Sequence, residues 1–379
     1  MNKMLYVLNV ANRVNNFSEA SMLAAKELGI EFHIAGNWGY KNENEKIFDE
    51  EKLGIKIHQI DFQRNPLHPI NIKAFKQLKK LVELEKFDVI HCNTPTGGVL
   101  GRLCAKKYGI FCIYQAHGFH FFKGASKLNW MIYYPIERLL ARLTNILITI
   151  NEEDYEISRK FSLRHNGMKI KVSGVGIKLS NQKESIDRNL YRAELGLNSS
   201  DIVIISMGDL IKRKNYENAI DAINKINNKK VHYLICGTGP NLEKLKKLSK
   251  KYNLEDNIHF LGFRNDIDNL LYISDIFLLS SFQEGLPRST MEAMAKGLPV
   301  ACSNIRGNRD LVENNKSGVL FDPHNSTDIA NKLNRLLKSN LNEIGLYNKS
   351  KIRSFSLNEV KKEMEGIYRN IEMNWRINK

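Results

Sequence analysis

Short apolar runs alternate with amphipathic stretches along the whole chain. In the first half, apolar runs predict strands at residues 4–10, 31–36, 55–62, 88–92, 110–115 and 145–150. The stretches between them carry apolar side chains at helical spacing and predict helices at 18–28, 66–84, 99–108 and 136–142. Strands that alternate with helices in this way are typical of a doubly wound parallel sheet, which binds ligands at the carboxyl ends of its strands.

The same alternation starts again in the second half. Strands are predicted at 201–207, 231–236, 257–262 and 275–281, and helices at 216–226, 289–296, 328–337 and 357–371. Between the halves, a strand turns on Gly174 and Gly176, and the polar stretch 178–188 follows. Because a polar segment after two glycines is typical of a linker, we place a domain boundary there. The chain is therefore predicted to be an α/β protein with domains at 1–177 and 178–357.

The composition is that of a soluble globular protein. The chain has 379 residues, of which 42% are hydrophobic and 26% charged. No apolar run approaches the roughly 20 residues that a membrane-spanning helix needs, and the N-terminus turns polar too soon for a signal peptide. A cytoplasmic location is therefore expected. The five cysteines are scattered without a C-x-x-C pair, which argues against a metal cluster or a disulfide framework.

The net charge narrows the class of partner without deciding it. The chain carries 57 basic and 41 acidic residues, a formal net charge of +16. This excess favours nucleic acid, anionic lipid or phosphorylated ligands, although Lys-rich solvated faces produce the same excess. The run GFHFFKGASKLNWMIYY at 118–134 mixes aromatic residues with lysines. It predicts either a patch at a membrane interface or core aromatics beneath a loop.

The stretch EGLPRSTMEAMAKGLPVA at 284–301 carries the most chemistry. It follows an apolar strand, and Pro287 suits the first turn of a helix that Gly297 ends. N–H groups at a helix start carry partial positive charge and are a natural seat for phosphate. Glu284 stands before that start and Glu292 stands about two turns later, so both carboxylates can accept hydrogen bonds from hydroxyls in one cleft. This combination describes a sugar nucleotide site, although two glutamates at this spacing alone are usually solvated.

A second candidate lies in the loop between the predicted strand 201–207 and the helix 216–226. Lys212, Arg213 and Lys214 are three consecutive cations at this strand end and helix start. Such a place suits a diphosphate leaving group. The alternative is an ordinary basic loop in contact with solvent.

The stretch 284–301 resembles the E-x7-E signature of the family 4 retaining glycosyltransferases. HGFHFF, YYPIER and EGLPRSTMEAM together resemble bacterial capsule and surface-polysaccharide enzymes. The resemblance implies the GT-B fold, in which two Rossmann-like doubly wound parallel-sheet domains face a central cleft. The last helix, about 358–379, would return to the first domain. The N-terminal domain would take the acceptor and the C-terminal domain the nucleotide-sugar donor. Protein cations would stabilise the leaving group, so neither a metal ion nor another cofactor is expected.

The resemblance also assigns roles to single residues. Glu284 would lie by the donor sugar, Glu292 would bind the nucleotide ribose, and Lys214 matches the family lysine. Asp209 stands where the family has Arg, which leaves Lys212 or Arg213 to supply the second cation. The other donor-binding residues are expected along the diphosphate and sugar, and beside the base: Gly285, Leu286, Pro287, Arg288 and Ser289, and Gly262, Phe263 and Arg264.

The first domain contributes fewer candidates. His117 follows a strand, and by resemblance it contacts the donor sugar and joins Glu284 and Lys214 as a catalytic residue, although a lone His is more often structural. Asn93 and Thr94 are expected on the acceptor side, and His120 either positions the acceptor or packs against the fold.

The sequence therefore predicts a retaining glycosyltransferase. It would move a sugar of the N-acetylhexosamine type from a UDP-sugar to a lipid-linked saccharide of the undecaprenyl-diphosphate type, in bacterial capsule or surface-polysaccharide synthesis. An anionic membrane surface is the expected partner, with the enzyme peripheral at the inner face of the cell membrane. Two alternatives stay open: another GT-B enzyme such as a sugar-nucleotide epimerase, and a basic nucleic-acid-binding protein. The chain carries no recognised nucleic-acid motif, so no nucleic acid is expected as a partner.

Overall fold

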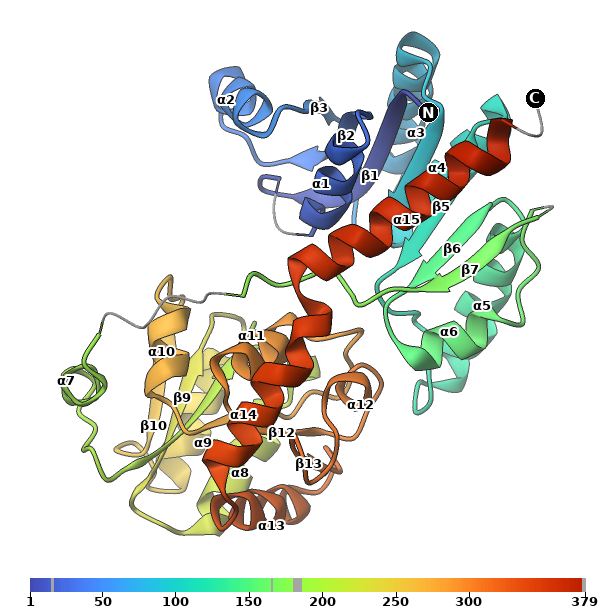
Figure 1. Ribbon diagram of the computed structural model, residues 1–379. Coiled ribbons are helices and arrows are strands. Elements are labelled where there is room, and N and C mark those ends of the chain that lie inside the picture. The colour runs from blue at the N-terminus through green and yellow to red at the C-terminus, as the bar shows by residue number, and fades with distance from the viewer. Residues whose placement is uncertain (15–16, 165, 180–185, 377–379) are drawn as a thin grey trace. The chain divides into compact units, whose positions relative to one another are not determined.

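The computed structural model describes residues 1–14, 17–164, 166–179 and 186–376 (Figure 1). The chain forms two compact units, one of Met1–Gly176 with Leu357–Lys379 and one of Ile177–Ser356. The division falls beside Gly174 and Gly176, where the sequence predicts the domain boundary. Most of the predicted linker after them, residues 180–185, lies outside the described residues.

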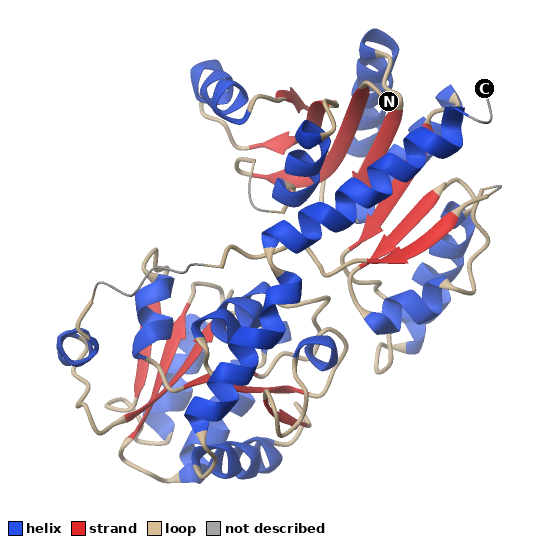
Figure 2. Cartoon of the chain, viewed as in Figure 1, coloured by secondary structure: helices blue, strands red, loops and turns tan. Residues whose placement is uncertain are grey.

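The first unit is built on a seven-stranded sheet in which every described strand pair is parallel (Figure 2). The strand order is β3-β2-β1-β4-β5-β6-β7. The strands are β1 (Lys3–Ala11), β2 (Glu31–Trp38), β3 (Lys56–Gln59), β4 (Val89–Asn93), β5 (Phe111–Ala116), β6 (Ile146–Thr149) and β7 (Met168–Lys171). The helices are α1 (Glu19–Glu27), α2 (Glu43–Leu53), α3 (Ile70–Glu85), α4 (Pro95–Tyr108), α5 (Lys127–Ala141), α6 (Glu152–Ser158) and α15 (Leu357–Arg376).

The second unit repeats this plan on a six-stranded parallel sheet of order β10-β9-β8-β11-β12-β13. The strands are β8 (Ile202–Met207), β9 (Val231–Cys236), β10 (Ile258–Gly262), β11 (Ile276–Leu279), β12 (Val300–Ser303) and β13 (Gly318–Phe321). The helices are α7 (Arg188–Glu194), α8 (Tyr216–Ile226), α9 (Leu242–Lys251), α10 (Ile267–Ile273), α11 (Arg288–Lys296), α12 (Asn308–Leu311), α13 (Ser326–Leu337) and α14 (Leu341–Lys351), with 3-10 turns η1 (Lys212–Lys214) and η2 (Ile352–Phe355).

Helices cover both faces of the second sheet, and successive residues of a strand point to opposite faces. Ile204 of β8 packs into one core together with residues of α8 and α13. Its neighbour Val203 packs into a second core with residues of α10 and α11. The continuous apolar runs that predict the strands are thus explained by helices on both sides of the sheet.

The helix predicted at 99–108 begins earlier, at Pro95, so residues 95–98 are also helical. Pro95 occupies the first helical turn, where its missing N–H has no cost. The glycines that suggest a loop are required by close packing instead. A Cβ on Gly98 would lie 2.5 Å from the Tyr114 ring, and one on Gly101 would lie 2.6 Å from the Cβ of Cys92.

The helix predicted at 136–142 also begins earlier, at Lys127. The Ser126 side chain caps it by accepting a hydrogen bond from the Asn129 N–H. In the run 118–134, Phe119 and Phe121 are buried in the core, and Trp130 packs against this cluster. Leu128, Met131, Ile132 and Tyr133 of the same run are exposed, so its two halves differ in burial. In the part of the chain that the structure covers, no helix is both long and apolar enough to traverse a bilayer.

The C-terminal helix α15 packs on α1 and completes the first unit. Its apolar side chains Val360, Met364 and Ile367 are buried. The Tyr368 hydroxyl lies 3.0 Å from Nδ1 of His91 on β4. This polar contact joins chain segments 277 residues apart.

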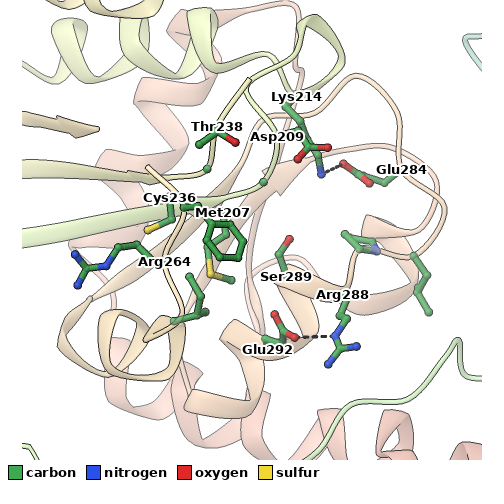
Figure 3. A pocket seen from close by; sticks show the side chains of 16 residues that line it. Met207, Asp209, Lys214, Cys236, Thr238, Arg264, Glu284, Arg288, Ser289 and Glu292 are labelled. Atoms are coloured by element: carbon green, nitrogen blue, oxygen red, sulfur yellow. Dashed lines mark hydrogen bonds and ion pairs between the residues drawn. The ribbon is translucent and has the colours of Figure 1, made fainter. Parts of the chain in front are cut away.

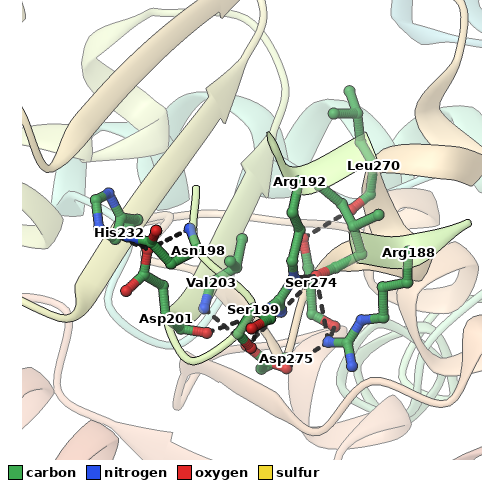
Figure 4. Close-up of polar contacts among 11 residues, drawn as sticks. Arg188, Arg192, Asn198, Ser199, Asp201, Val203, His232, Leu270, Ser274 and Asp275 are labelled. Atoms are coloured by element: carbon green, nitrogen blue, oxygen red, sulfur yellow. Dashed lines mark hydrogen bonds and ion pairs between the residues drawn. The ribbon is translucent and has the colours of Figure 1, made fainter. Parts of the chain in front are cut away.

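Buried charges fix α7 to the second sheet (Figure 4). Arg192 is buried and donates hydrogen bonds to the carbonyl oxygens of Ile273 and Asp201. Its guanidinium also lies 2.9 Å from a carboxylate oxygen of Asp275, whose other oxygen is 2.6 Å from Arg188. Because a buried charge is stable only when it is paired and hydrogen-bonded, this network specifies the position of α7.

Candidate active site

Helix α11 presents a start that no side chain caps. The helix lies between β11 and β12, and Gly297 ends it in the left-handed region at φ 82°. Pro287 occupies the N-cap and supplies no side-chain hydrogen bond. The N–H groups of the first turn therefore receive no hydrogen bond from the N-cap side chain. The resulting partial positive charge is what a phosphate group requires.

Glu284 lies just before this helix start and is held by two cations. Its side chain is only 9% exposed, and its Oε1 atom lies 2.8 Å from Nζ of Lys214. The same oxygen is 3.2 Å from the Arg213 guanidinium. Lys214 is positioned by Asn215, whose side chain donates hydrogen bonds to the carbonyl oxygens of Ser280 and Pro323. A buried carboxylate and a nearly buried ammonium group therefore meet at the carboxyl ends of β8 and β11.

These groups line a pocket of about 430 Å³ on the second unit (Figure 3). The lining comes from the segments that follow β8, β9, β10 and β11, which is the edge where a doubly wound sheet binds ligands. The lining residues are Met207, Gly208, Asp209, Lys214, Cys236, Gly237, Thr238, Phe263, Arg264, Ile267, Glu284, Leu286, Pro287, Arg288, Ser289 and Glu292.

Glu292 lies one turn beyond the start of α11 and faces this pocket, as Figure 3 shows. Its carboxylate accepts a hydrogen bond of 2.7 Å from Nε of Arg288. Each partner is about one third exposed, so both remain accessible to a ligand. The pair places a guanidinium group beside the uncapped helix start, a role that the sequence did not indicate for the Arg288 side chain.

The turn η1 separates the three consecutive cations. A 3-10 helix has about three residues per turn, so its successive side chains point roughly 120° apart. Lys214 lines the pocket, whereas Lys212 and Arg213 do not. Arg213 instead donates a hydrogen bond of 2.6 Å to the carbonyl oxygen of Gln283. The structure therefore gives no support to Lys212 or Arg213 as the second cation of the pocket.

The residues expected beside the base divide into two kinds. Phe263 is 75% exposed and stands in the pocket lining, where its ring face is accessible. Arg264 also lines the pocket, but its guanidinium is bonded to Asp266 at 2.7 Å. That hydrogen bond is the largest cause that lowers the pKa of Asp266 to about 2. Gly262 and Gly285 lie beside the pocket in sequence but not in its lining.

Sequence reasoning missed the part of the pocket formed by Met207, Gly208, Cys236, Gly237 and Thr238. A Cβ on Gly237 would lie 2.0 Å from the Gly208 carbonyl oxygen, so the two loops cross in direct contact. The sequence does contain a signal for this part of the pocket: Gly208 and Gly237 directly follow the neighbouring strands β8 and β9. Asp209, which stands where the family has Arg, also lines the pocket.

On the first unit, His117 and Asn93 come together at the ends of β5 and β4. Nε2 of His117 lies 2.9 Å from Oδ1 of Asn93, which also accepts a hydrogen bond from the Tyr6 hydroxyl. Since an amide oxygen only accepts, Nε2 carries the imidazole proton. Nδ1 of His117 and Nδ2 of Asn93 are buried and have no hydrogen-bond partner among the described residues. This pair can therefore accept from and donate to a ligand.

The other two first-unit candidates lie close by in sequence. Thr94 is the residue before α4 and adopts a left-handed φ of 63°. His120 packs edge-on against Tyr133, with ring centroids 4.7 Å apart.

Burial lowers the pKa of His117 to about 3, so its imidazole is neutral near pH 7. Within the described ranges, no three His, Cys, Asp or Glu side chains gather as a metal site requires.

Comparisons with known proteins agree with this arrangement. Residues 187–351 match the family described as Glycosyl transferases group 1, and residues 15–151 match the family described as Glycosyl transferase 4-like. The chain is 32% identical over 352 residues to the putative glycosyltransferase EpsD of Bacillus subtilis, which covers 90% of each chain.

The names of two further relatives state both the acceptor and the sugar that is transferred. One is the UDP-Gal:alpha-D-GlcNAc-diphosphoundecaprenol alpha-1,3-galactosyltransferase of Escherichia coli, 33% identical over 273 residues and 70% of each chain. The other is the N,N'-diacetylbacillosaminyl-diphospho-undecaprenol alpha-1,3-N-acetylgalactosaminyltransferase of Campylobacter jejuni. It is 26% identical over 298 residues, which is 76% of this chain and 77% of the relative.

The fold has counterparts among solved structures. The Anabaena protein HepE in complex with UDP and glucose matches 98% of this chain and 100% of its own, with a TM-score of 0.78. At 18% identity this likeness concerns the fold alone. The two parallel-sheet units, the family matches and the long alignment to EpsD lead to one assignment. The chain belongs to the bacterial glycosyltransferases of group 1, the family 4-like enzymes of the GT-B fold.

Proposed function

We propose that this enzyme is a retaining glycosyltransferase that takes a sugar from a UDP-sugar and adds it to a lipid-linked saccharide on an undecaprenyl-diphosphate type of carrier. The observation that carries the proposal is the pocket of the second unit. There an uncapped helix start, the ammonium group of Lys214 and the carboxylate of Glu292 line one space. These are the groups that a nucleoside diphosphate needs.

The diphosphate is the leaving group, and its stabilisation is the main catalytic task. When the bond from the anomeric carbon to the phosphate oxygen breaks, negative charge grows on UDP. Lys214 and the start of α11 oppose that charge from fixed positions. We assign the second cation to Arg288, since its side chain lines the same pocket. On this account protein cations do the work of a metal ion, and no metal is required.

The nucleoside occupies the other end of the pocket. Glu292 accepts hydrogen bonds from the ribose hydroxyls, for which an ionised carboxylate is well suited. Arg288, released from Glu292, then turns toward the phosphates. Phe263 offers an accessible ring face on which a uracil base stacks.

Glu284 supports the sugar rather than attacking it. Its carboxylate oxygen is already engaged by Lys214 and Arg213, which lowers its value as a nucleophile. We therefore place it beside the oxocarbenium-like sugar as an electrostatic support, with the acceptor attacking from the face that the leaving group vacates. On the first unit, the neutral His117 can accept a hydrogen bond from a hydroxyl of a ligand bound there, through Nδ1.

The acceptor and the donor sugar are proposed from the relatives. Two of them act on saccharides carried by diphosphoundecaprenol, and they transfer galactose and N-acetylgalactosamine. We therefore propose an acceptor of that class and an N-acetylhexosamine donor, with the enzyme working at the inner face of the cell membrane in capsule or surface-polysaccharide synthesis.

The proposal is tested by offering the purified enzyme UDP-GlcNAc, UDP-GalNAc, UDP-Gal and UDP-Glc, each with a lipid-diphosphate GlcNAc acceptor and excess EDTA. We expect one UDP-N-acetylhexosamine to be consumed and an α-linked disaccharide to form, as judged by mass spectrometry and NMR. A β-linked product would contradict retention. Interconversion of UDP-sugars without any acceptor would instead identify an epimerase.

A further inference from the structure

Helix α5 of the first unit presents apolar side chains on the side that faces away from its core. Leu128, Met131, Ile132, Ile136 and Leu139 are all exposed, Met131 to 70% and Leu139 to 63%. With Pro135, most of them recur at the i, i+3, i+4, i+7 and i+11 positions from Leu128, which is one stripe of a helix. We call these five exposed side chains the outer face of α5.

Helix α5 is anchored to the unit through the side opposite the outer face. The opposite side of α5 carries Trp130, Tyr134 and Ala141, which pack into the core. Glu137 lies on the same inner side and forms an ion pair of 2.8 Å with the buried Arg102. Because α5 is already anchored through this inner side, five apolar side chains in contact with water need another explanation. Contiguous exposed apolar surface marks a site of association.

The exposed charged side chains of α5 and of its two ends are cationic, although the half-buried Glu153 accepts a hydrogen bond from the Lys123 N–H. Lys127 and Arg138 are exposed on α5 itself, and Lys123 and Arg142 are exposed at its two ends. The helix contains a single carboxylate, that of Glu137, and this is paired with Arg102. An apolar stripe bordered by cations is the pattern of a helix that lies in the interface of an anionic bilayer.

We propose that the outer face of α5 docks on the surface of an anionic lipid bilayer. The aliphatic side chains enter the boundary between headgroups and acyl chains, while the lysine and arginine side chains extend to the lipid phosphates. A second copy of the chain is a poorer occupant, since a two-fold contact through this face would bring the cations of both copies together. The inference deepens the proposed function, because a lipid-linked acceptor is presented at such a surface.

The test is co-sedimentation of the full-length protein with vesicles of phosphatidylcholine alone and with vesicles that also contain phosphatidylglycerol. We expect at least tenfold tighter binding to the anionic vesicles. The double variant Met131→Glu/Leu139→Glu should lose at least tenfold of that binding, and Lys127→Gln/Arg138→Gln should lose several-fold. The matched control is Leu346→Glu, because Leu346 of α14 is also 70% exposed and lies on the other unit. It should bind as the wild type does.

Three outcomes would overturn the proposal: equal binding to both kinds of vesicle, unchanged binding by Met131→Glu/Leu139→Glu, or a wild-type dimer that this variant converts to a monomer in light scattering. All the substituted positions are exposed, and circular dichroism checks that each variant is folded. Sugar transfer to a water-soluble acceptor should be equal in wild type and variant. If the wild type transfers no sugar to any acceptor, the proposed function fails while the vesicle result stands.

Discussion

The carboxyl ends of the two sheets carry different chemistry. In the second unit this edge is charged: Lys214 pairs with Glu284 at 2.8 Å, and Arg288 pairs with Glu292 at 2.7 Å. In the first unit, the part of this edge at the ends of β4 and β5 is neutral, with Asn93 and an imidazole of His117 whose pKa burial lowers to about 3. Both edges come from the same strand–helix plan, so the difference lies in the loop residues and not in the fold.

The difference indicates which part of the reaction each edge serves. A departing diphosphate gains negative charge, which fixed cations and helix dipoles stabilise. Sugar hydroxyls stay neutral and need donors and acceptors without charge. We therefore assign the leaving group to the charged edge and sugar hydroxyls to the neutral one.

The largest effect is expected from Lys214→Ala. Among the described residues, Lys214 is the one lysine that lines the pocket, and its loss should lower kcat/KM about 10²- to 10³-fold, the range for removing one group that stabilises transition-state charge. Lys244→Ala is the matched control, because Lys244 makes a similar 2.9 Å ion pair with Glu217 but is two-thirds exposed. Initial rates with a UDP-sugar measure both. Equal rates for Lys214→Ala and the control would show that the leaving group is not stabilised at this edge.

Glu292→Gln should weaken UDP binding by about 10- to 100-fold, since it replaces charge-assisted hydrogen bonds to the ribose by neutral ones. Inorganic pyrophosphate, which has no ribose, should bind the variant as well as the wild type or more tightly, because Arg288 is released from its ion pair. Isothermal titration with both ligands measures this. Parallel losses for UDP and pyrophosphate would show that Glu292 does not act on the ribose.

A smaller loss, about tenfold in UDP affinity, is expected for Arg288→Gln if its guanidinium acts as the second cation. Lys212→Gln is the control, because Lys212 belongs to the same cationic triplet as Lys214 but lies outside the pocket lining. It should change affinity by less than about twofold. A larger loss for Lys212→Gln than for Arg288→Gln would instead assign the second cation to Lys212.

The smallest effect concerns the stability of the first unit, in which His91 of β4 contacts Tyr368 of α15. Burial lowers the pKa of His91 from 6.5 to about 3. Between these values the unfolded chain binds a proton that the folded chain does not, so the free energy of unfolding falls as pH drops below 6.5. The slope for one such group is at most about 1.4 kcal/mol per pH unit.

The variant His91→Asn should make that decline shallower in denaturant titrations at pH 7, 6 and 5. The exposed His68→Asn serves as its control and should follow the wild type. A decline that is equally steep in His91→Asn would mean that the β4–α15 contact is not sensitive to acid.

The sequence predicted those features that lie within one local unit. Glu284, the start of α11 and Glu292 fall within nine consecutive residues, so the rules of helix ends place them together. Lys214 is 70 residues away from Glu284, but it also follows a parallel strand, and such strands end at a common edge.

The features that were missed depend on contacts that no local pattern encodes. Thr238 and Met207 become neighbours in the pocket only through the pairing of β8 with β9. Which of three consecutive cations faces the pocket depends on the rotation of η1. Helix α5 was predicted too short because apolar side chains on both of its sides leave little polar contrast to set the helical period.

The most direct test of the charged edge is a crystal structure of the enzyme with UDP. The account predicts that the diphosphate lies within hydrogen-bond distance of the Ser289 N–H and the Lys214 ammonium group, with the ribose hydroxyls on Glu292. UDP bound at any other place on the second unit, or at this place with its ribose away from Glu292, would contradict it.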